Sequence, residues 1–245
     1  MTAAPPRGPR RAAVLFDVDG TLVDSAYLHT LAWWQAFRQA GYDVPMASIH
    51  RSVGMGGDRI LARLLPDGRD RNEDSTIMAS HAGVFATFWP ALRPLEGARE
   101  LLARCHEDGL AVALASSARQ RDLEVLRAAI GADAFIDAAT SSADAKESKP
   151  APDILVAALH TVGVQASDAV YVGDAVWDIY AAGKLDIPAI GLTCGGTSEA
   201  ELRDAGAVEI YTSPRALLEN LADSAIGRLA ARVRTIAEPG ARRGP

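Results

Sequence analysis

The sequence predicts an α/β fold, in which a mostly parallel, doubly wound sheet has helices on both faces and carries an inserted helical domain. Three observations lead to this prediction. Short apolar runs stop abruptly at polar or turn residues, segments with helical periodicity separate these runs, and the first interval between runs is unusually long.

The strands are predicted from short apolar runs, each bounded by polar or turn residues. The four clearest runs lie at residues 12–16, 110–115, 169–172 and 187–192. Runs of this length and composition are typical of strands that are buried on both faces of a parallel sheet. Sequence of this kind continues to about Ile210, which sets the extent of the predicted sheet.

The inserted domain is predicted from the interval between the first two runs. It is about ninety residues long, far more than one crossover connection needs. Helices are predicted inside it at residues 25–40, 58–65 and 73–89. Pro90 and Pro94 then mark the return to the repeating pattern. We therefore predict a helical cap at residues 25–90 and a core made of residues 12–24 and 91–236.

The charge of the chain is unevenly distributed along its 245 residues. The net charge is −6, but residues 1–11 carry +3 and residues 228–245 carry +4, so that residues 12–227 carry −13. An acidic compact region argues against a nucleic-acid-binding face. The ends at 1–11 and 237–245 are rich in Pro, Gly and Arg, and we expect them to be disordered tails.

The cysteine content and the apolar segments indicate the compartment. Cys105 and Cys194 form no disulfide framework and lack metal-ligand spacing. The apolar stretch near the N-terminus is too short for a signal peptide or a membrane span. We expect a cytoplasmic protein with no membrane partner. No periodicity indicates a coiled coil, so a monomer or a small homo-oligomer is expected.

Polar residues follow the predicted strands, at the sheet edge where open α/β sheets bind their ligands. They are Asp17 and Asp19 after the first run, Ser116 and Ser117 after the second, Lys149 before a predicted helix, and Asp174 and Asp178 after the run at 169–172. Four carboxylates gathered at one edge cannot all stay ionised without compensation. A hard divalent cation resolves this conflict, and Mg²⁺ takes one or two carboxylates together with phosphate oxygens.

The spacing of Asp17 and Asp19 suggests that the two carboxylates have different catalytic roles. At i and i+2 they can share one side of an extended segment. One carboxylate can then act as the nucleophile while its neighbour exchanges a proton. A transferring phosphoryl group also needs charge stabilisation, which the Ser116 hydroxyl and the Lys149 ammonium group can supply.

Four motifs, in this order, resemble those of the haloacid dehalogenase-like (HAD) hydrolases. They are Asp17-Val18-Asp19-Gly20-Thr21-Leu22-Val23-Asp24-Ser25, then Ser116, then Lys149-Pro150-x-Pro152-Asp153, then Gly173-Asp174-x-x-x-Asp178. The resemblance implies a Rossmann-like core. The long insertion after the first motif resembles the helical cap of the phosphoglycolate phosphatase and β-phosphoglucomutase branch.

The resemblance also implies residue roles. Asp17 would be the nucleophile that becomes a phospho-aspartate, and Asp19 would protonate the leaving oxygen and later activate water. Ser116 and Lys149 would bind phosphate, with Ser117 as a further candidate. Mg²⁺ would be held by Asp17, the carbonyl of Asp19 and Asp174, with Asp178 adjusting or joining that set.

Within the family, the residues favour a Mg²⁺-dependent phosphatase that acts on a small phosphorylated metabolite, a sugar phosphate or a compound like phosphoglycolate. A halide leaving group needs no proton, so Asp19 argues against dehalogenation. Phosphonoacetaldehyde hydrolases depend on a cap lysine, and the chain has no lysine between Gly20 and Lys146.

Two alternatives to the phosphatase stay open. His29-x-x-Ala32-Trp33 resembles a pattern of β-phosphoglucomutases, in which the histidine orients the proton-transferring aspartate. The fourth motif, however, lacks the Glu-Asp pair that is frequent in mutases. The other alternative is a non-catalytic regulatory protein that binds a phosphorylated metabolite.

A glycine-rich segment at residues 53–58 is expected to contact the substrate from the cap. It includes Gly54 and Gly56, but it lacks the Gly-Lys-Ser/Thr ending of a P-loop and follows no predicted strand. Arg51 and Arg59 flank it, and we expect them either to bind a second anionic group of the substrate or to face solvent.

Overall fold

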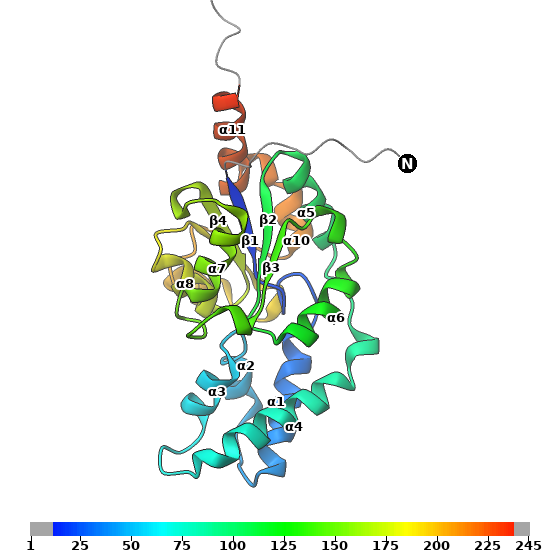
Figure 1. Ribbon diagram of the computed structural model, residues 1–245, viewed down its shortest axis with the longest axis vertical. Helices are drawn as coiled ribbons and strands as arrows, with labels where there is room; N and C mark the ends of the chain where they lie inside the picture. Colours follow the sequence, from blue (N-terminus) through cyan, green and yellow to red (C-terminus); the bar gives the residue numbers. More distant parts are fainter. Residues whose placement is uncertain (1–11, 238–245) are drawn as a thin grey trace, which may run out of the picture.

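The computed structural model describes residues 12–237, which form a six-stranded sheet with helices on both faces and a helical layer at one end (Figure 1). The strand order is β3-β2-β1-β4-β5-β6 and every neighbouring pair is parallel. The strands are β1 (Ala13–Phe16), β2 (Ala111–Ala115), β3 (Ala138–Thr140), β4 (Ala169–Gly173), β5 (Ala189–Leu192) and β6 (Glu209–Tyr211). The predicted parallel α/β sheet is confirmed.

The two faces of the sheet bury separate hydrophobic clusters, as alternating side chains of a strand require. Val14 and Phe16 of β1 pack in one cluster, whereas Ala13 and Leu15 pack in the other. Every residue of β1, β2, β4 and β5 is buried, which explains why these four strands are visible in the sequence as apolar runs.

The edge strands lack that signature. The three residues of β3, Ala-Ala-Thr, form no apolar run, and the sequence analysis missed this strand. The residues of β6 are half-buried. The run predicted at 187–192 begins as a strand only at Ala189, because Pro188 has no N–H to donate to a ladder.

Within residues 12–237, seven helices cover the sheet. They are α5 (Ala98–Glu107), α6 (Gln120–Ile130), α7 (Asp153–Val162), α8 (Val176–Gly183), α9 (Glu199–Asp204), α10 (Pro214–Glu219) and α11 (Ala225–Ala237). Buried residues of α5, α6, α10 and α11 join the cluster of Val14, and those of α7, α8 and α9 join the cluster of Leu15. The sheet is therefore doubly wound.

Four further helices lie together beyond one end of the sheet (Figure 1). They are α1 (Ala26–Gln39), α2 (Met46–His50), α3 (Gly57–Leu64) and α4 (Asp74–Ala86). They have a hydrophobic cluster of their own, which includes Trp33, Phe37 and Leu61. All four fall inside the cap predicted at residues 25–90, here called the cap segment. Only the short α2 was not predicted.

Short 3₁₀ helices complete the described chain. They are Arg71–Glu73, Trp89–Ala91, Asp133–Phe135, Ser142–Asp144, Ala166–Asp168, Thr193–Gly195 and Leu221–Asp223. The tails predicted at 1–11 and 237–245 lie outside the described residues, except for Ala237, which ends α11. Among residues 12–237, no helix combines the length and the apolar composition that a membrane crossing requires.

Candidate active site

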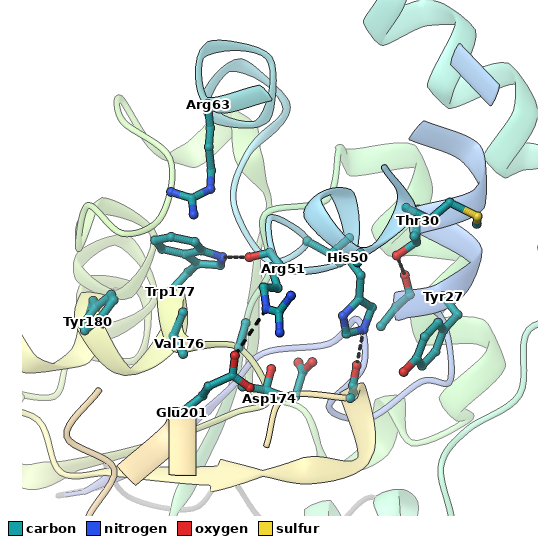
Figure 2. A pocket seen from close by; sticks show the side chains of 18 residues that line it. Tyr27, Thr30, His50, Arg51, Arg63, Asp174, Val176, Trp177, Tyr180 and Glu201 are labelled. Carbon is teal, nitrogen blue, oxygen red and sulfur yellow. Dashed lines mark hydrogen bonds and ion pairs between the residues drawn. The ribbon is translucent and has the colours of Figure 1, made fainter. Parts of the chain in front are cut away.

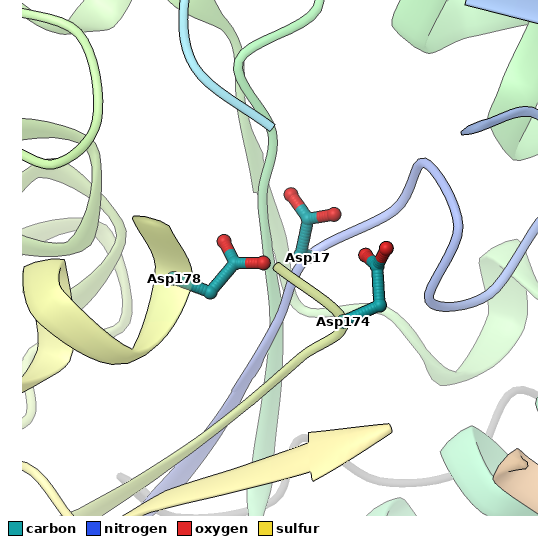
Figure 3. A group of neighbouring side chains, drawn as sticks. All are labelled: Asp17, Asp174 and Asp178. Atoms are coloured by element: carbon teal, nitrogen blue, oxygen red, sulfur yellow. The ribbon is translucent and has the colours of Figure 1, made fainter. Parts of the chain in front are cut away.

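The parallel pairing of β1 with β4 brings three aspartates together at the carboxyl edge of the sheet (Figure 3). Asp17 follows β1, and its backbone N–H donates to the carbonyl of Val172 at 2.9 Å, which extends the ladder. Asp174 follows β4 and Asp178 lies in the first turn of α8. One carboxylate oxygen from each of the three lies within 4.8 Å of the others, and all three side chains are buried.

Lys149 is fully buried and lies between Asp17 and Asp178. Its Nζ is 2.6 Å from Asp17 Oδ1, and 2.9 Å from Asp178 Oδ1, the Tyr171 hydroxyl and the Ala115 carbonyl. Its three protons are therefore shared among four oxygens. The phosphate-binding role of Lys149 stays a prediction.

Asp178 is engaged on both of its oxygens. Besides Lys149, Oδ1 accepts from the Tyr171 hydroxyl at 2.9 Å, and Oδ2 accepts from the backbone N–H of Ala175 at 3.1 Å. These contacts favour a role for Asp178 as the counter-ion that fixes Lys149. Tyr171 was not predicted as a site residue, because a tyrosine in an apolar strand gives no sign of its hydroxyl partners.

The cluster carries more negative charge than Lys149 compensates. Burial raises the pKa of Asp17 to about 7 although Lys149 opposes the shift, and Asp178 and Asp19 add to it. Burial together with Asp178 and Asp17 also raises the pKa of Asp174 well above its usual value. Burial disfavours the charge of Lys149, but Asp17 and Asp178 outweigh it and raise the pKa of the lysine. A divalent cation fits such a site, with Asp17 and Asp174 as the carboxylates best placed to hold it.

Three glycines lie directly against the carboxylates, which occupy the space that a side chain at these positions would need. A Cβ on Gly20 would lie 2.5 Å from Asp174 Oδ2, and a Cβ on Gly195 would overlap the same carboxylate. A Cβ on Gly173 would lie 2.6 Å from Asp178 Cγ. Any side chain at these positions would displace a carboxylate. We call Gly20, Gly173 and Gly195 the glycine frame.

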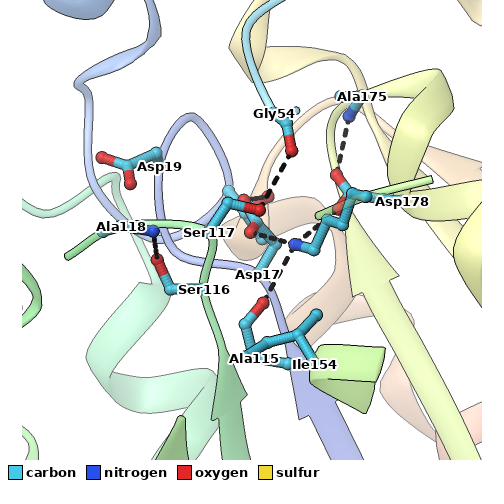
Figure 4. Close-up of polar contacts among 12 residues, drawn as sticks. Asp17, Asp19, Gly54, Ala115, Ser116, Ser117, Ala118, Ile154, Ala175 and Asp178 are labelled. Atoms are coloured by element: carbon cyan, nitrogen blue, oxygen red, sulfur yellow. Dashed lines mark hydrogen bonds and ion pairs between the residues drawn. The ribbon is translucent and has the colours of Figure 1, made fainter. Parts of the chain in front are cut away.

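The Asp19 side chain turns away from this cluster and toward the cap segment (Figure 4). Its Oδ1 accepts from Ser25 Oγ at 2.6 Å and lies 3.0 Å from His29 Nε2. Burial opposes ionisation, but His29 and Ser25 outweigh it and hold the pKa of Asp19 below its usual value. His29 therefore lies where it can orient Asp19, and the two adjacent motif aspartates occupy different environments.

A second histidine, missed by the sequence analysis, completes this arrangement. His81 of α4 places Nε2 3.2 Å from His29 Nδ1, and its ring stacks on Trp33 with centroids 4.0 Å apart. Phe85, one turn further along α4, stacks on His29 at 3.8 Å. The i, i+4 spacing of His81 and Phe85 is the only sequence signal, because the contact joins helices that are far apart in the chain.

Replacement of His81 tests its link to Asp19. Burial above all, with His29 and Arg119, lowers the pKa of His81 well below its usual value, so that His81 is neutral and its Nε2–H can donate to His29 Nδ1. The contact holds the His29 ring with Nε2 3.0 Å from Asp19 Oδ1. In His81→Phe we expect kcat to fall about tenfold with KM unchanged, because one hydrogen bond is lost while the ring stack remains.

His81→Gln is the matched control for this prediction, since its amide N–H can replace the donor. We expect it to recover most of the lost turnover in steady-state assays. Wild-type kcat in His81→Phe would show that the contact only packs the two helices.

The predicted phosphate-binding serines have different surroundings. Ser116 is fully buried, and its Oγ accepts from the backbone N–H of Ala118 at 3.0 Å. Ser117 Oγ donates to the carbonyl of Gly54 at 3.2 Å, which connects the core to the cap segment. Ser117 lines a cavity above Asp17 and Asp19, as Gly54 and Gly56 do, whereas Ser116 does not.

This cavity, here called the substrate pocket, has a volume of about 260 Å³. It is enclosed by the ends of β1 and β2 on the core side and by α1, α3, α4 and residues 53–58 on the cap side. His29, Trp33 and His81 line it, and the active-site role of His29 stays a prediction. It is the place where a leaving group would lie beside Asp19.

The structure does not bring Arg51 and Arg59 into the substrate pocket. Arg59 pairs with Glu147, with 2.6 Å between Nη2 and Oε2. Arg51 lies 3.4 Å from Glu201 and lines a second cavity of about 610 Å³ (Figure 2).

The second cavity lies between the cap segment and the core on the other side of Val53, and it reaches Asp174. Two contacts beside it join the cap segment to the core (Figure 2). Trp177 Nε1 donates to the Arg51 carbonyl at 2.9 Å, and His50 Nε2 lies 2.9 Å from the Gly195 carbonyl.

The fold and the site define the class of this protein as a hydrolase of the doubly wound α/β type. A family model described as haloacid dehalogenase-like hydrolase matches residues 12–186, more than half of the chain, and the protein belongs to that family. This result confirms the predicted family and shows that the chain is an enzyme.

Several known proteins are similar to this chain. Protein SUPPRESSOR OF QUENCHING 1, chloroplastic, of Arabidopsis thaliana is 33% identical over 202 residues, which are 80% of this chain and 19% of that protein. The chain thus spans about a fifth of that relative. A phosphoglycolate phosphatase of Pseudomonas fluorescens is 26% identical, over 86% of this chain and 80% of its own. The crystal structure of a hydrolase from Pseudomonas syringae has a TM-score of 0.83 at 30% identity, covering 87% of this chain and 99% of its own.

Proposed function

We propose that this protein is a Mg²⁺-dependent phosphatase that hydrolyses a small phosphorylated metabolite through a phospho-aspartate on Asp17. The observation that carries the proposal is the contrast between two aspartates two residues apart. Asp17 contacts Lys149 in the carboxylate cluster, whereas Asp19 contacts His29 at the substrate pocket. Carboxylates in such different environments are suited to different roles in one reaction.

In the first half of the reaction, a carboxylate oxygen of Asp17 attacks the phosphorus atom and the bond from phosphorus to the ester oxygen breaks. Asp19 gives a proton to the departing alcohol. The phosphate dianion beside Asp19 favours uptake of that proton, because like charges raise the pKa of a carboxyl group. Lys149, 2.6 Å from Asp17, offsets the charge of the transferring group.

In the second half, Asp19 takes a proton from water, which attacks the phosphorus of the phospho-aspartate and releases phosphate. The ionised form of Asp19, which His29 and Ser25 favour, is the form that this step needs. When bound by Asp17 and Asp174, Mg²⁺ supplies positive charge to the phosphoryl oxygens and to the carboxylates.

A panel of phosphorylated metabolites together with p-nitrophenyl phosphate tests the proposal. We expect release of inorganic phosphate that requires Mg²⁺ and stops with a chelator. A protein that binds phosphate and Mg²⁺ but hydrolyses no member of the panel would be the regulatory binding protein instead.

The second candidate is a sugar-phosphate mutase, which the contact between His29 and Asp19 favours. A mutase would use the same first half-reaction but return the phosphoryl group to a sugar hydroxyl. With β-glucose 1-phosphate and a bisphosphate primer, a phosphatase releases inorganic phosphate and a mutase forms glucose 6-phosphate.

The affinity for Mg²⁺ is expected to rise with pH. Asp17, with a pKa of about 7, holds a proton at pH 5.5 that the cation has to displace, and the pKa of Asp174 is shifted in the same upward direction by burial, Asp178 and Asp17. At pH 8 Asp17 is ionised, so binding is tighter and releases fewer protons. Titration calorimetry at pH 5.5, 7 and 8 in buffers of different ionisation enthalpy measures both quantities. A pH-independent affinity would contradict this assignment of the site.

Three properties expected from the sequence complete the proposal. We infer a cytoplasmic protein, a monomer or a small homo-oligomer, that has no nucleic-acid partner.

A further inference from the structure

We propose that the alcohol part of the substrate is compact and uncharged, and that the substrate carries no carboxylate or second phosphate group. This inference rests on the proposed phosphatase function and narrows its substrate class. It concerns the walls of the substrate pocket, where the leaving group lies beyond the transferred phosphoryl group.

The charges of the pocket walls disfavour a second anion. Apart from the two reacting aspartates, the charged residues among those that line the pocket are Asp58, Asp122 and Arg119. Arg119 donates from both Nε and Nη2 to Asp122 Oδ2, at 3.2 Å each. Asp58 lies 3.9 Å from Arg59 Nε and accepts from Ser148 Oγ at 2.8 Å. The arginine of the lining is thus already paired with Asp122, and no free arginine among the described lining residues faces a second anionic group.

The cap side of the pocket is largely apolar. Its apolar side chains are Trp33, Met55, Ile60 and Met78, and they line the pocket together with the backbone of the glycine-rich segment and with His29, His81 and Asp58. A carboxylate placed here would lose its hydration and gain no cationic partner, whereas the C–H surface of an alcohol or a sugar would be buried favourably. The cap wall therefore selects for an uncharged group.

The volume of about 260 Å³ suits a small leaving group. It lies below the range of about 300–1,000 Å³ that is usual for sites of drug-sized ligands. The nearby arginines do not extend the pocket into an anion site, since Arg59 pairs with Glu147 and Arg51 with Glu201. The pocket fits the monophosphate of a polyol or of a small sugar.

A pair of substrates that differ in one group tests this inference. Glycerol 1-phosphate and 3-phosphoglycerate are similar in size, but a CH₂OH group of the first is a carboxylate in the second. We expect kcat/KM to be about 100-fold higher for glycerol 1-phosphate, because an unpaired charge in a desolvated pocket is strongly disfavoured. 2-Phosphoglycolate is expected to be as poor a substrate as 3-phosphoglycerate.

A charge added to the wall gives the complementary test. Met55→Lys is expected to raise kcat/KM for 3-phosphoglycerate relative to glycerol 1-phosphate about tenfold. Met55→Gln, which has a similar length and no charge, is the matched control and should leave the ratio unchanged. Inhibition of p-nitrophenyl phosphate hydrolysis by each compound gives the same comparison for binding.

The outcomes separate the two proposals. Hydrolysis of p-nitrophenyl phosphate together with equal or faster hydrolysis of 3-phosphoglycerate would overturn the substrate class and leave the phosphatase function standing. Absence of hydrolysis of every phosphate ester would overturn the phosphatase function, and the substrate class with it. An unchanged ratio in Met55→Lys, in a variant that melts like the wild type, would also contradict the inference.

Discussion

Asp17→Asn is expected to lower the turnover of phosphate esters by about 10⁴-fold or more, because the amide cannot attack phosphorus. The variant should also fail to accumulate the acid-stable, hydroxylamine-sensitive acyl phosphate that the wild-type enzyme forms when it is quenched during turnover. Steady-state assays with p-nitrophenyl phosphate and acid quenching with labelled substrate measure the two effects.

The same variant must be shown to fold. The amide keeps the volume of the carboxylate, and Lys149 retains its contacts to Asp178, Tyr171 and Ala115. We therefore expect a cooperative thermal transition. Asp204→Asn, at the exposed end of α9, makes the same chemical change away from the site and should keep full activity. Near wild-type turnover in Asp17→Asn would rule out the phospho-aspartate mechanism.

Lys149→Met is expected to reduce both stability and activity. The ammonium group is fully buried between Asp17 and Asp178, so its loss leaves buried carboxylates without their cation. Breaking a buried pair from one side typically lowers the free energy of unfolding by about 3–5 kcal/mol. We expect a loss of this size at pH 8 in the metal-free protein, measured by urea denaturation, together with loss of phosphate binding.

The pH dependence of that loss has a definite sign. Without Lys149 the pKa of Asp17 rises beyond about 7, so the folded variant holds a proton that the unfolded chain releases above its usual pKa of 3.8. The variant therefore loses stability as the pH rises, and the difference from the wild type is smaller at pH 5 than at pH 8. Lys146→Met is the matched control, because Lys146 is exposed and only three residues away. Equal stability of Lys149→Met and Lys146→Met at pH 8 would contradict this account.

The parallel sheet was predictable because its central strands are buried on both faces and therefore consist of apolar runs. The same rule failed for β3, whose residues are Ala138, Ala139 and Thr140. That strand lies at the edge of the sheet and pairs only with β2, so its short and weakly apolar sequence is sufficient. Its position is fixed by the ladder with β2 and by Thr140 Oγ1, which donates to the Leu114 carbonyl at 3.1 Å. These partners are distant in the chain, so the residues of β3 alone do not reveal them.

The carboxylate cluster was predictable because parallel strands end at a common edge of the sheet. This places Asp17 beside Asp174 regardless of the conformation of the loops. The direction of the Asp19 side chain could not be predicted in this way, since it depends on the contact between Asp19 and His29 at the start of α1. The ion-pair partners of Arg51 and Arg59 could not be predicted from the sequence either. Their partners Glu201 and Glu147 lie 150 and 88 residues away in the chain, and only the folded arrangement brings them together.

The glycine frame has an evolutionary consequence. Because a methyl group at Gly20, Gly173 or Gly195 would already collide with a carboxylate, almost no single substitution at these positions preserves the reaction centre. On the opposite wall of the substrate pocket, Met55 and Met78 have no such constraint, since their flexible side chains can be exchanged for others of similar volume. New substrate preferences are therefore accessible by single mutations on the cap side, while the chemistry is inherited unchanged.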